Sequence, residues 1–162
     1  MVSVQVETAW GRLQGGRTFL GSMQDRADFP FLTALELSSC PYLGGFNDPD
    51  SVPLDYYSRL VDGASLPLIV LEGGWPSEPA GAITSTPALQ ATYIARQARI
   101  LNSARAAGLF QITFTDLDLS AILLPGGSIL ALFAHLGLVD SALRAKPALA
   151  VWDSVLTRPY RP

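Results

Sequence analysis

The stretch Pro67 to Ser77, which reads PLIVLEGGWPS, decides the fold class of this chain. It begins with an apolar run, Leu68 to Leu71, and then changes to Glu72, two glycines and Trp75. A short continuous apolar run of this kind is typical of a strand covered on both faces, as in a parallel sheet. In parallel α/β folds, functional residues collect in the loops at the carboxyl ends of the strands. Glu72 is therefore the leading candidate for a catalytic residue.

Three other runs also read as strands. Two of them, at residues 2–7 and 110–115, alternate apolar and polar side chains with the period of two that a strand requires. The three runs are Val2 to Glu7, Phe31 to Leu37 and Phe110 to Thr115.

Helical sequence separates the later strands. Thr86-Pro87 reads as an N-cap followed by proline in the first turn, and the helix is expected to end at Gly108. Lys146-Pro147 is expected to start another helix. A shorter helix is expected at about Leu54 to Asp62, and Gly15 to Ala27 reads as a loop plus a short helix.

The resulting order, β-loop-β-α-β-α-β-α, predicts a parallel α/β sheet with right-handed crossovers. The 162 residues suffice for one domain, but a complete (β/α)8 barrel typically takes about 250. Four parallel strands form either a small open sheet or half of a barrel with two unpaired edges. The strand count alone leaves both arrangements open.

Composition limits the possible partners. Hydrophobic residues make up 49% of the chain and charged residues 15%, against roughly 25% charged in an average domain, so an unusually large interface is expected. The net charge of −3 and the lack of basic runs give no footprint for nucleic acid. The single cysteine, Cys40, excludes an internal disulfide, and we expect it to be a small half-buried side chain.

Two stretches bear on targeting and on membrane insertion. Met1 runs straight into the first strand pattern, so no secretory signal is expected there. Ala121 to Val139 is uncharged and long enough to span a bilayer, but Pro125-Gly126-Gly127 breaks it. A loop followed by a buried helix that contains His135 is the favoured interpretation, without a membrane span.

Carboxylates and aromatic residues recur where the strands are expected to end. Glu7 and Trp10, and likewise Glu72 and Trp75, lie three residues apart, and Tyr42 enriches the loop between them. A sugar ring stacks its C–H face on an indole, while a carboxylate stabilises positive charge at the anomeric carbon. The pattern therefore favours a carbohydrate ligand.

The residues 67–77 and their neighbours resemble a known enzyme family. PLIVLEGGWPS is similar to the seventh-strand motif of retaining barrel glycosidases of the large 4/7 superfamily, of the endo-β-1,4-galactanase and cellulase-like kind. Ser38 to Tyr42 looks like their sixth-strand segment, and Ala148 to Trp152 looks like their closing helix. In that alignment the four predicted strands are strands five to eight, so the resemblance covers only the C-terminal half of the barrel.

The resemblance implies that Glu72 is the nucleophile that forms a covalent glycosyl-enzyme. It also implies that Trp75 lines the sugar site and that Tyr42 orients Glu72, without a cofactor or metal. The general acid/base of the family follows strand four in an Asn-Glu motif, which this chain lacks. Such families are often secreted, but the sequence does not fix the compartment.

Other candidate residues have simpler interpretations. Glu7 is more readily a solvated or loop-bonded residue than a substrate ligand, and Trp10 ranks below Trp75. Asp116 and Asp118 are expected to cap loops, and the segment Phe46 to Asp50 is expected to form a turn.

We therefore predict a half (β/α)8 barrel that pairs its open edges with a second copy, since two sets of four strands make the eight of a closed barrel. Two functions remain open. The chain is either part of a retaining glycoside hydrolase acting on a β-linked polysaccharide, which needs an N-terminal half in trans, or a catalytically silent self-assembling scaffold.

Overall fold

Four parallel strands form one sheet in the order β1-β2-β3-β4. The computed structural model describes residues 3–13, 18–61, 63–120, 122–123, 125 and 128–158. The strands are β1 (Ser3–Gln5), β2 (Leu35–Ser39), β3 (Leu68–Gly73) and β4 (Gly108–Leu109). The chain is thus an α/β protein, and its sheet is consistent with half of a (β/α)8 barrel.

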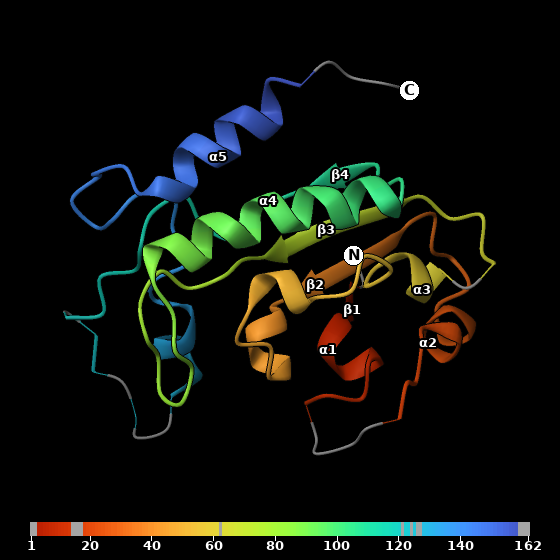
Figure 1. The fold of residues 1–162 in the computed structure, drawn as a ribbon. Coiled ribbons are helices and arrows are strands. Elements are labelled where there is room, and N and C mark those ends of the chain that lie inside the picture. The colour runs from red at the N-terminus through yellow and green to blue at the C-terminus, as the bar shows by residue number, and fades with distance from the viewer. Residues whose placement is uncertain are drawn as a thin grey trace.

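Helices cover one face of this sheet, and α4 runs along β3 with α5 packed against it (Figure 1). Thr86 caps α4 by accepting a hydrogen bond from the Leu89 amide at 3.2 Å, as the sequence predicts. The helices are α1 (Val6–Ala9), α2 (Met23–Asp28), α3 (Ser58–Val61), α4 (Pro87–Ser103) and α5 (Pro147–Leu156), with 3-10 turns η1 (Pro41–Gly44), η2 (Pro49–Ser51) and η3 (Ile129–Phe133).

Strand register divides the sheet into two faces. Val4, Leu37 and Val70 lie side by side across the first three strands, and all three side chains are buried in the core against the helices. Because side chains alternate along a strand, Glu36 and Ile69 lie on the opposite face, where both are half-buried. We call this second side the open face.

A bulge in β3 changes the alternation at its carboxyl end. Leu37 pairs with Val70, but the next residue of β2, Ser38, pairs with Glu72, so Leu71 is the extra residue. A bulge re-aims the side chains that follow it. Here it places Glu72 beside Ser38, and Gly73 beside the buried Ser39.

The structure confirms the first three predicted strands but shifts their bounds. β1 ends at Gln5, and α1 begins immediately, so Glu7 belongs to a short helix, whereas Val2 lies outside the described residues. The second strand begins at Leu35 instead of Phe31, whose side chain is exposed. The third extends to Gly73 and includes Glu72.

The fourth strand was predicted at the wrong residues. β4 is Gly108–Leu109, and the alternating run from Phe110 follows it, although the Phe110 amide still donates to Val70 O at 2.8 Å. The apolar members of this run, Phe110, Ile112 and Phe114, are exposed. Their alternation matched a strand with one buried face, but the chain described here provides no layer to bury that face.

Three helix predictions also need correction. α4 ends at Ser103, before Gly108, which opens β4, and α3 is much shorter than Leu54 to Asp62. The buried helix expected around His135 is absent from the described residues, where η3 (Ile129–Phe133) is a 3-10 turn without buried residues. Gly15 to Ala27 contains the start of α2, as expected, although residues 15–17 lie outside the described part. Among the helices that the structure describes, none has the length and apolarity to cross a membrane.

The pairing of β2 with β3 predicts that position 73 tolerates only glycine. A Cβ atom built on Gly73 would lie 2.4 Å from the Ser39 carbonyl oxygen, whereas one on Gly108 would meet only Ile69 Cγ2 at 3.5 Å. Gly73→Ala should lower the free energy of unfolding by about 1–3 kcal/mol. Gly108→Ala is the matched control and should change it by less than about 0.5 kcal/mol. Urea denaturation measures both, and equal effects would contradict the close approach.

Candidate functional site

Glu72 is exposed at the carboxyl end of β3, and its carboxylate accepts a hydrogen bond from the Ser38 hydroxyl of β2. Both side chains belong to the row that the bulge creates on the open face. The arrangement leaves the second carboxylate oxygen of Glu72 free of any protein hydrogen bond among the described residues. An exposed, oriented carboxylate at a strand end is equipped to act as a nucleophile or a base.

Glu7 has the opposite environment, because its side chain is fully buried. Its carboxylate accepts hydrogen bonds from Gln5 Nε2 at 2.5 Å, Tyr56 Oη at 3.0 Å and Ser39 Oγ at 3.4 Å. Burial raises the pKa of the Glu7 carboxyl, although hydrogen bonds from the Cys40 amide, Tyr56 and Gln5 oppose the effect. Glu7 is therefore bonded within the protein, as its simpler interpretation predicted, and a substrate-binding role for it stays a prediction.

The neighbouring serines of β2 thus bind two different carboxylates. Ser38 donates to Glu72 on the open face, and Ser39 donates to Glu7 on the helix-covered face. Because adjacent residues of a strand point to opposite sides, one dipeptide orients both acids. The sequence shows Ser38-Ser39, but without the register it does not show what these serines hold.

Trp75 is also fully buried. Its indole nitrogen donates to Ser85 Oγ at 3.0 Å, and its ring packs against Tyr93 with centroids 5.3 Å apart. In this position Trp75 anchors the loop that follows Glu72. The sugar-stacking role expected from the resemblance stays a prediction.

Tyr42 does not orient Glu72, which corrects the expectation from the resemblance. Its hydroxyl donates to the Leu132 carbonyl at 3.1 Å, and its ring is buried edge-on against Trp75. Burial raises the pKa of the Tyr42 phenol, so it stays protonated. Ser38 occupies the position that the sequence assigned to this tyrosine.

Trp10 is half-buried at the end of α1. Its indole nitrogen donates to the Tyr56 carbonyl at 2.9 Å, and the two rings stack with centroids 5.1 Å apart. The Arg59 guanidinium lies 5.0 Å from the centre of the indole. Trp10 therefore packs beside the buried Glu7 network, and its predicted contact with substrate stays a prediction.

Cys40 and two aspartates match their simpler interpretations. Cys40 is buried more fully than expected, and burial raises the pKa of its thiol to about 12. Asp48 accepts a hydrogen bond from the Asp50 amide at 2.9 Å, which is the predicted turn. Asp118 does the same with the Ser120 amide at 2.9 Å, and hydrogen bonding by the Ser120 side chain and amide lowers the pKa of the Asp118 carboxyl.

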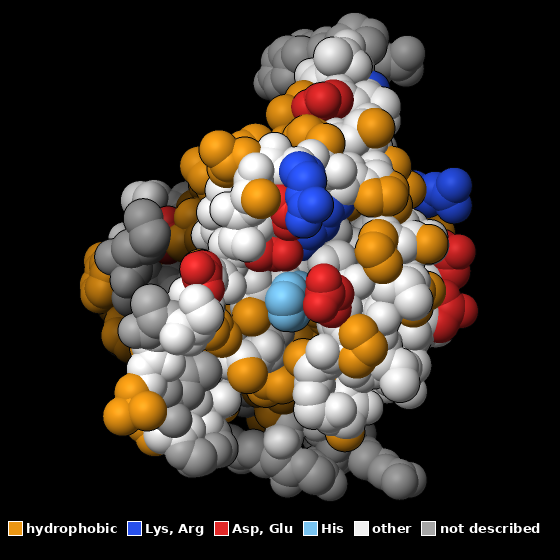
Figure 2. Space-filling model, turned by 90° about the vertical axis from the view of Figure 1, so that its left-hand side faces the viewer, with side chains coloured by type: hydrophobic (Ala, Val, Ile, Leu, Met, Phe, Trp, Pro, Cys, Tyr) orange, Lys and Arg blue, Asp and Glu red, His pale blue; other side chains and the backbone are white. Residues whose placement is uncertain are grey.

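A second polar cluster, centred on His135, lies on the side toward which β2 and β3 point in Figure 1. Figure 2 views that side and shows the only histidine of the chain at its centre, with acidic side chains on both sides and basic ones above. His135 and its neighbours line a pocket of about 370 Å³, to which Glu78, Asp116, Asp118, Asp140 and Arg144 also contribute.

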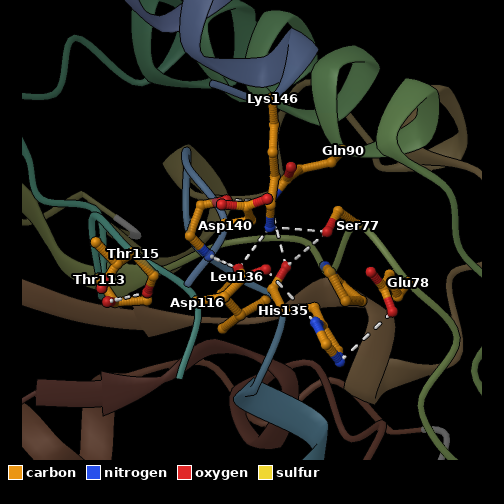
Figure 3. A network of polar contacts seen from close by, with 12 residues as sticks. Ser77, Glu78, Gln90, Thr113, Thr115, Asp116, His135, Leu136, Asp140 and Lys146 are labelled. Atoms are coloured by element: carbon orange, nitrogen blue, oxygen red, sulfur yellow. Dashed lines mark hydrogen bonds and ion pairs between the residues drawn. The ribbon is translucent and has the colours of Figure 1, made fainter. Parts of the chain in front are cut away.

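Asp116 holds the cluster together from the segment after β4. It accepts hydrogen bonds from Lys146 Nζ at 2.5 Å and from the Gly137 amide at 3.0 Å, which confirms its loop-capping role (Figure 3). Lys146 Nζ also donates to Ser77 Oγ at 2.9 Å. Since Lys146 is committed to an ion pair, it is a poor base for activating Ser77.

The sequence did not reveal this cluster, and the prediction that His135 is a buried core residue is wrong. Its side chain is 34% exposed. The residues concerned are spread over four segments, and no local spacing connects them. The only signal available from the sequence was that Asp116 follows a strand.

Comparison with known proteins shows the fold. No family model matches the chain, and no curated protein matches its sequence. Solved structures of carbohydrate-active enzymes do match. The Ruminococcus gnavus β-glucuronidase is 16% identical with a TM-score of 0.56, over 81% of this chain and 23% of that chain. The Bifidobacterium dentium β-glucuronidase gives 16% and 0.56, over 80% and 21%.

An active-site mutant of the Rhizomucor miehei β-1,3-glucanosyltransferase, solved with laminaritriose, is 19% identical with a TM-score of 0.51, over 72% of this chain and 42% of that chain. The chain therefore spans between a fifth and about two-fifths of these proteins. It shares a glycoside-hydrolase-like fold with part of them.

The buried position of Glu7 predicts a pH dependence of stability. Its folded-state pKa lies above the ordinary value of 4.5, so folding disfavours the ionised form. As the pH rises from about 4 to about 7, the wild type should therefore lose stability relative to Glu7→Gln. The loss is about 1.4 kcal/mol for each unit by which the folded-state pKa of Glu7 exceeds its unfolded-state pKa. Urea unfolding at several pH values measures this, with the exposed Asp50→Asn as the control that stays parallel to wild type. A wild type that gains stability relative to Glu7→Gln would contradict the dominance of burial.

Proposed function

We propose that this chain forms four strands of a retaining glycoside hydrolase barrel, in which Glu72 is the nucleophile toward a β-linked polysaccharide. The observation that carries the proposal is the exposed Glu72 carboxylate at the carboxyl end of β3, held by Ser38 on the open face. The shared fold with part of known glycosidases supports it. The strand-end motif of residues 67–77 adds the resemblance to retaining enzymes.

In this mechanism Glu72 attacks the anomeric carbon and the glycosidic C–O bond breaks, while an acid protonates the leaving oxygen. Water then hydrolyses the glycosyl-enzyme and releases Glu72. The hydrogen bond from Ser38 fixes one carboxylate oxygen and leaves the other to attack. A retaining site needs a second carboxyl group about 5–5.5 Å away, and the resemblance places it on a strand that this chain does not contain.

Completion of the site therefore requires further strands. β1 and β4 each have a partner on only one side in the described sheet, and exposed Phe110, Ile112 and Phe114 follow β4. Apolar side chains beside an unpaired edge favour pairing with more strands. We propose that a second copy of the chain, or an N-terminal half supplied in trans, adds the four strands that close the barrel.

A second function, a catalytically silent half-barrel scaffold, is favoured by a different observation. The two aromatic residues that the resemblance assigns to the Glu72 site, Trp75 and Tyr42, are enclosed by protein and bonded to Ser85 and Leu132. In this alternative both rings only stabilise the loops, and the sugar-stacking role predicted for Trp75 is lost. In this alternative the chain keeps the barrel architecture and assembles without turnover.

Hydrolysis of aryl β-glycosides separates the two functions. If Glu72 is the nucleophile, Glu72→Gln should lower kcat by about 10³-fold or more, because the covalent route is lost. Glu36→Gln is the matched control, because it changes a different acid on the open face, in β2, and it should retain most activity. Activity that survives Glu72→Gln would exclude Glu72 from the mechanism, and an inactive wild type would favour the scaffold.

Sedimentation equilibrium tests the self-association. The wild type should be a dimer at high concentration, and Phe110→Glu should weaken dimerisation by about 30-fold or more, because burying an unpaired carboxylate costs several kcal/mol. Leu123→Glu, at a fully exposed position away from β4 in sequence, should leave the dimer intact. A stable monomer at high concentration would contradict closure by a second copy.

A further inference from the structure

The pocket beside His135 has the size and the lining of a small-molecule site. Its volume of about 370 Å³ lies within the range of ligand pockets, about 300–1,000 Å³. Charged side chains form one part of its wall, and Leu117, Leu119 and Ala134 add apolar surface. The pocket can therefore enclose a molecule that carries both polar groups and hydrocarbon.

Asp116 presents an unused hydrogen-bond acceptor in this pocket. Its side chain is only 7% exposed, and its Oδ1 accepts hydrogen bonds from Lys146 Nζ at 2.5 Å and from the Gly137 amide at 3.0 Å. Neither Lys146 nor Gly137 lines the pocket. His135 does line it, and its ring lies on the Oδ2 side of Asp116, with Nδ1 3.5 Å from Oδ2 (Figure 3). Oδ1 is thus committed to the protein, while Oδ2 faces the pocket.

Nothing in the described part of the chain donates a hydrogen bond to Asp116 Oδ2. The nearest nitrogen, His135 Nδ1, is buried and makes no hydrogen bond either. A buried carboxylate oxygen without a donor costs free energy, and such groups are normally satisfied by protein, water or a ligand. A ligand that brings an N–H group to this point would therefore be stabilised.

The pocket also carries an excess of negative charge. Glu78 is 60% exposed, and no Lys or Arg of the residues described lies within ion-pair distance of it. Asp118 is exposed and bonded to Ser120 of its own loop, whereas Asp140 is paired with Arg144 at 2.6 Å. Together with Asp116 and Lys146, four carboxylates meet two fixed cations. Such an excess attracts a positively charged ligand.

The arrangement of the acceptors favours an organic cation. The described ranges contain no group of three or more His, Cys, Asp or Glu side chains that could hold a metal ion, so these acceptors do not converge on one point. A guanidinium binds best to a carboxylate that offers both oxygens, but Asp116 offers one. A primary ammonium is a compact charge with three N–H donors, and it needs only the single oxygen.

We propose that the pocket beside His135 binds a small molecule that carries a primary ammonium group, an amino sugar or an aliphatic diamine, with the ammonium at Asp116 Oδ2. Glu78 lies on the other side of the ring, with Oε2 3.7 Å from His135 Nε2. It accepts from a second donor of the same ligand, a hydroxyl or a second ammonium. The leucines contact the hydrocarbon part. This binding does not rest on Glu72 or on the proposed hydrolysis.

Binding is tested on the full chain at about pH 6.5, where carboxylates are ionised and an amine is protonated. The imidazole resonances of His135, the only histidine, report occupation of the pocket by NMR, and calorimetry gives the Kd. Glucosamine should bind about tenfold or more tightly than N-acetylglucosamine, which keeps the ring but loses the charge. No saturable shift with glucosamine or 1,4-diaminobutane at millimolar concentration would overturn the proposal, as would equal binding of glucosamine and its N-acetyl form when the diamine also gives no shift.

The same titrations distinguish the source of the ammonium group. Tighter binding of glucosamine than of 1,4-diaminobutane assigns the pocket to amino sugars, and the reverse order assigns it to aliphatic amines. Both results support an ammonium site, and neither requires turnover, so an inactive chain leaves the test intact.

Substitutions locate the ammonium group. Glu78→Gln should weaken binding of the tighter amine by about threefold, the range of an exposed charge pair. Asp50→Asn is the matched control, because it removes the same charge at an exposed position outside the pocket, and it should leave the Kd unchanged. Asp116→Asn, if folded by circular dichroism, should weaken binding by about tenfold or more. Equal effects of Glu78→Gln and Asp50→Asn would show a response to net charge alone and would contradict the site.

Discussion

A one-residue bulge in β3 determines what this protein presents at the carboxyl end of its sheet. Leu71 is the extra residue, and it brings Glu72 opposite Ser38. In a regular ladder Leu71 would lie opposite Ser38, and Glu72 would turn toward the helices, because a slip of one residue exchanges the two faces of a strand. Gly73 allows this geometry, since a side chain there would collide with the Ser39 carbonyl. The exposed carboxylate is thus a consequence of backbone register.

The same strand end separates two acids with different properties. Ser38 holds Glu72 on the open face, and Ser39 contributes to the buried network around Glu7. Burial makes Glu7 harder to ionise, while Glu72 is exposed to solvent. The enclosed Trp75 supports the loop after Glu72. The described chain therefore presents one exposed and one enclosed carboxylate near the same end of its sheet.

The sequence predicted those parts of the fold that local chemistry determines. Thr86-Pro87 starts a helix with a side-chain cap and a proline, Lys146-Pro147 starts one with a proline and no side-chain cap, and the apolar run before Glu72 forms a strand. The run from Phe110 was wrongly predicted to be a strand. Alternation of apolar and polar side chains fits a strand with one buried face, but it does not show whether a layer is present to cover that face. The bulge and the His135 cluster could not be predicted from the sequence, because both depend on contacts between distant segments.

Chemical labelling of carboxyl groups tests most directly whether the bulge exposes Glu72. A water-soluble carbodiimide with an amine nucleophile modifies accessible carboxyl groups, and peptide mass spectrometry locates the label. The structure predicts that Glu72 of the folded chain is modified readily while Glu7 is protected, and that both react after denaturation. Protection of Glu72, or equal modification of both acids in the folded chain, would contradict the account.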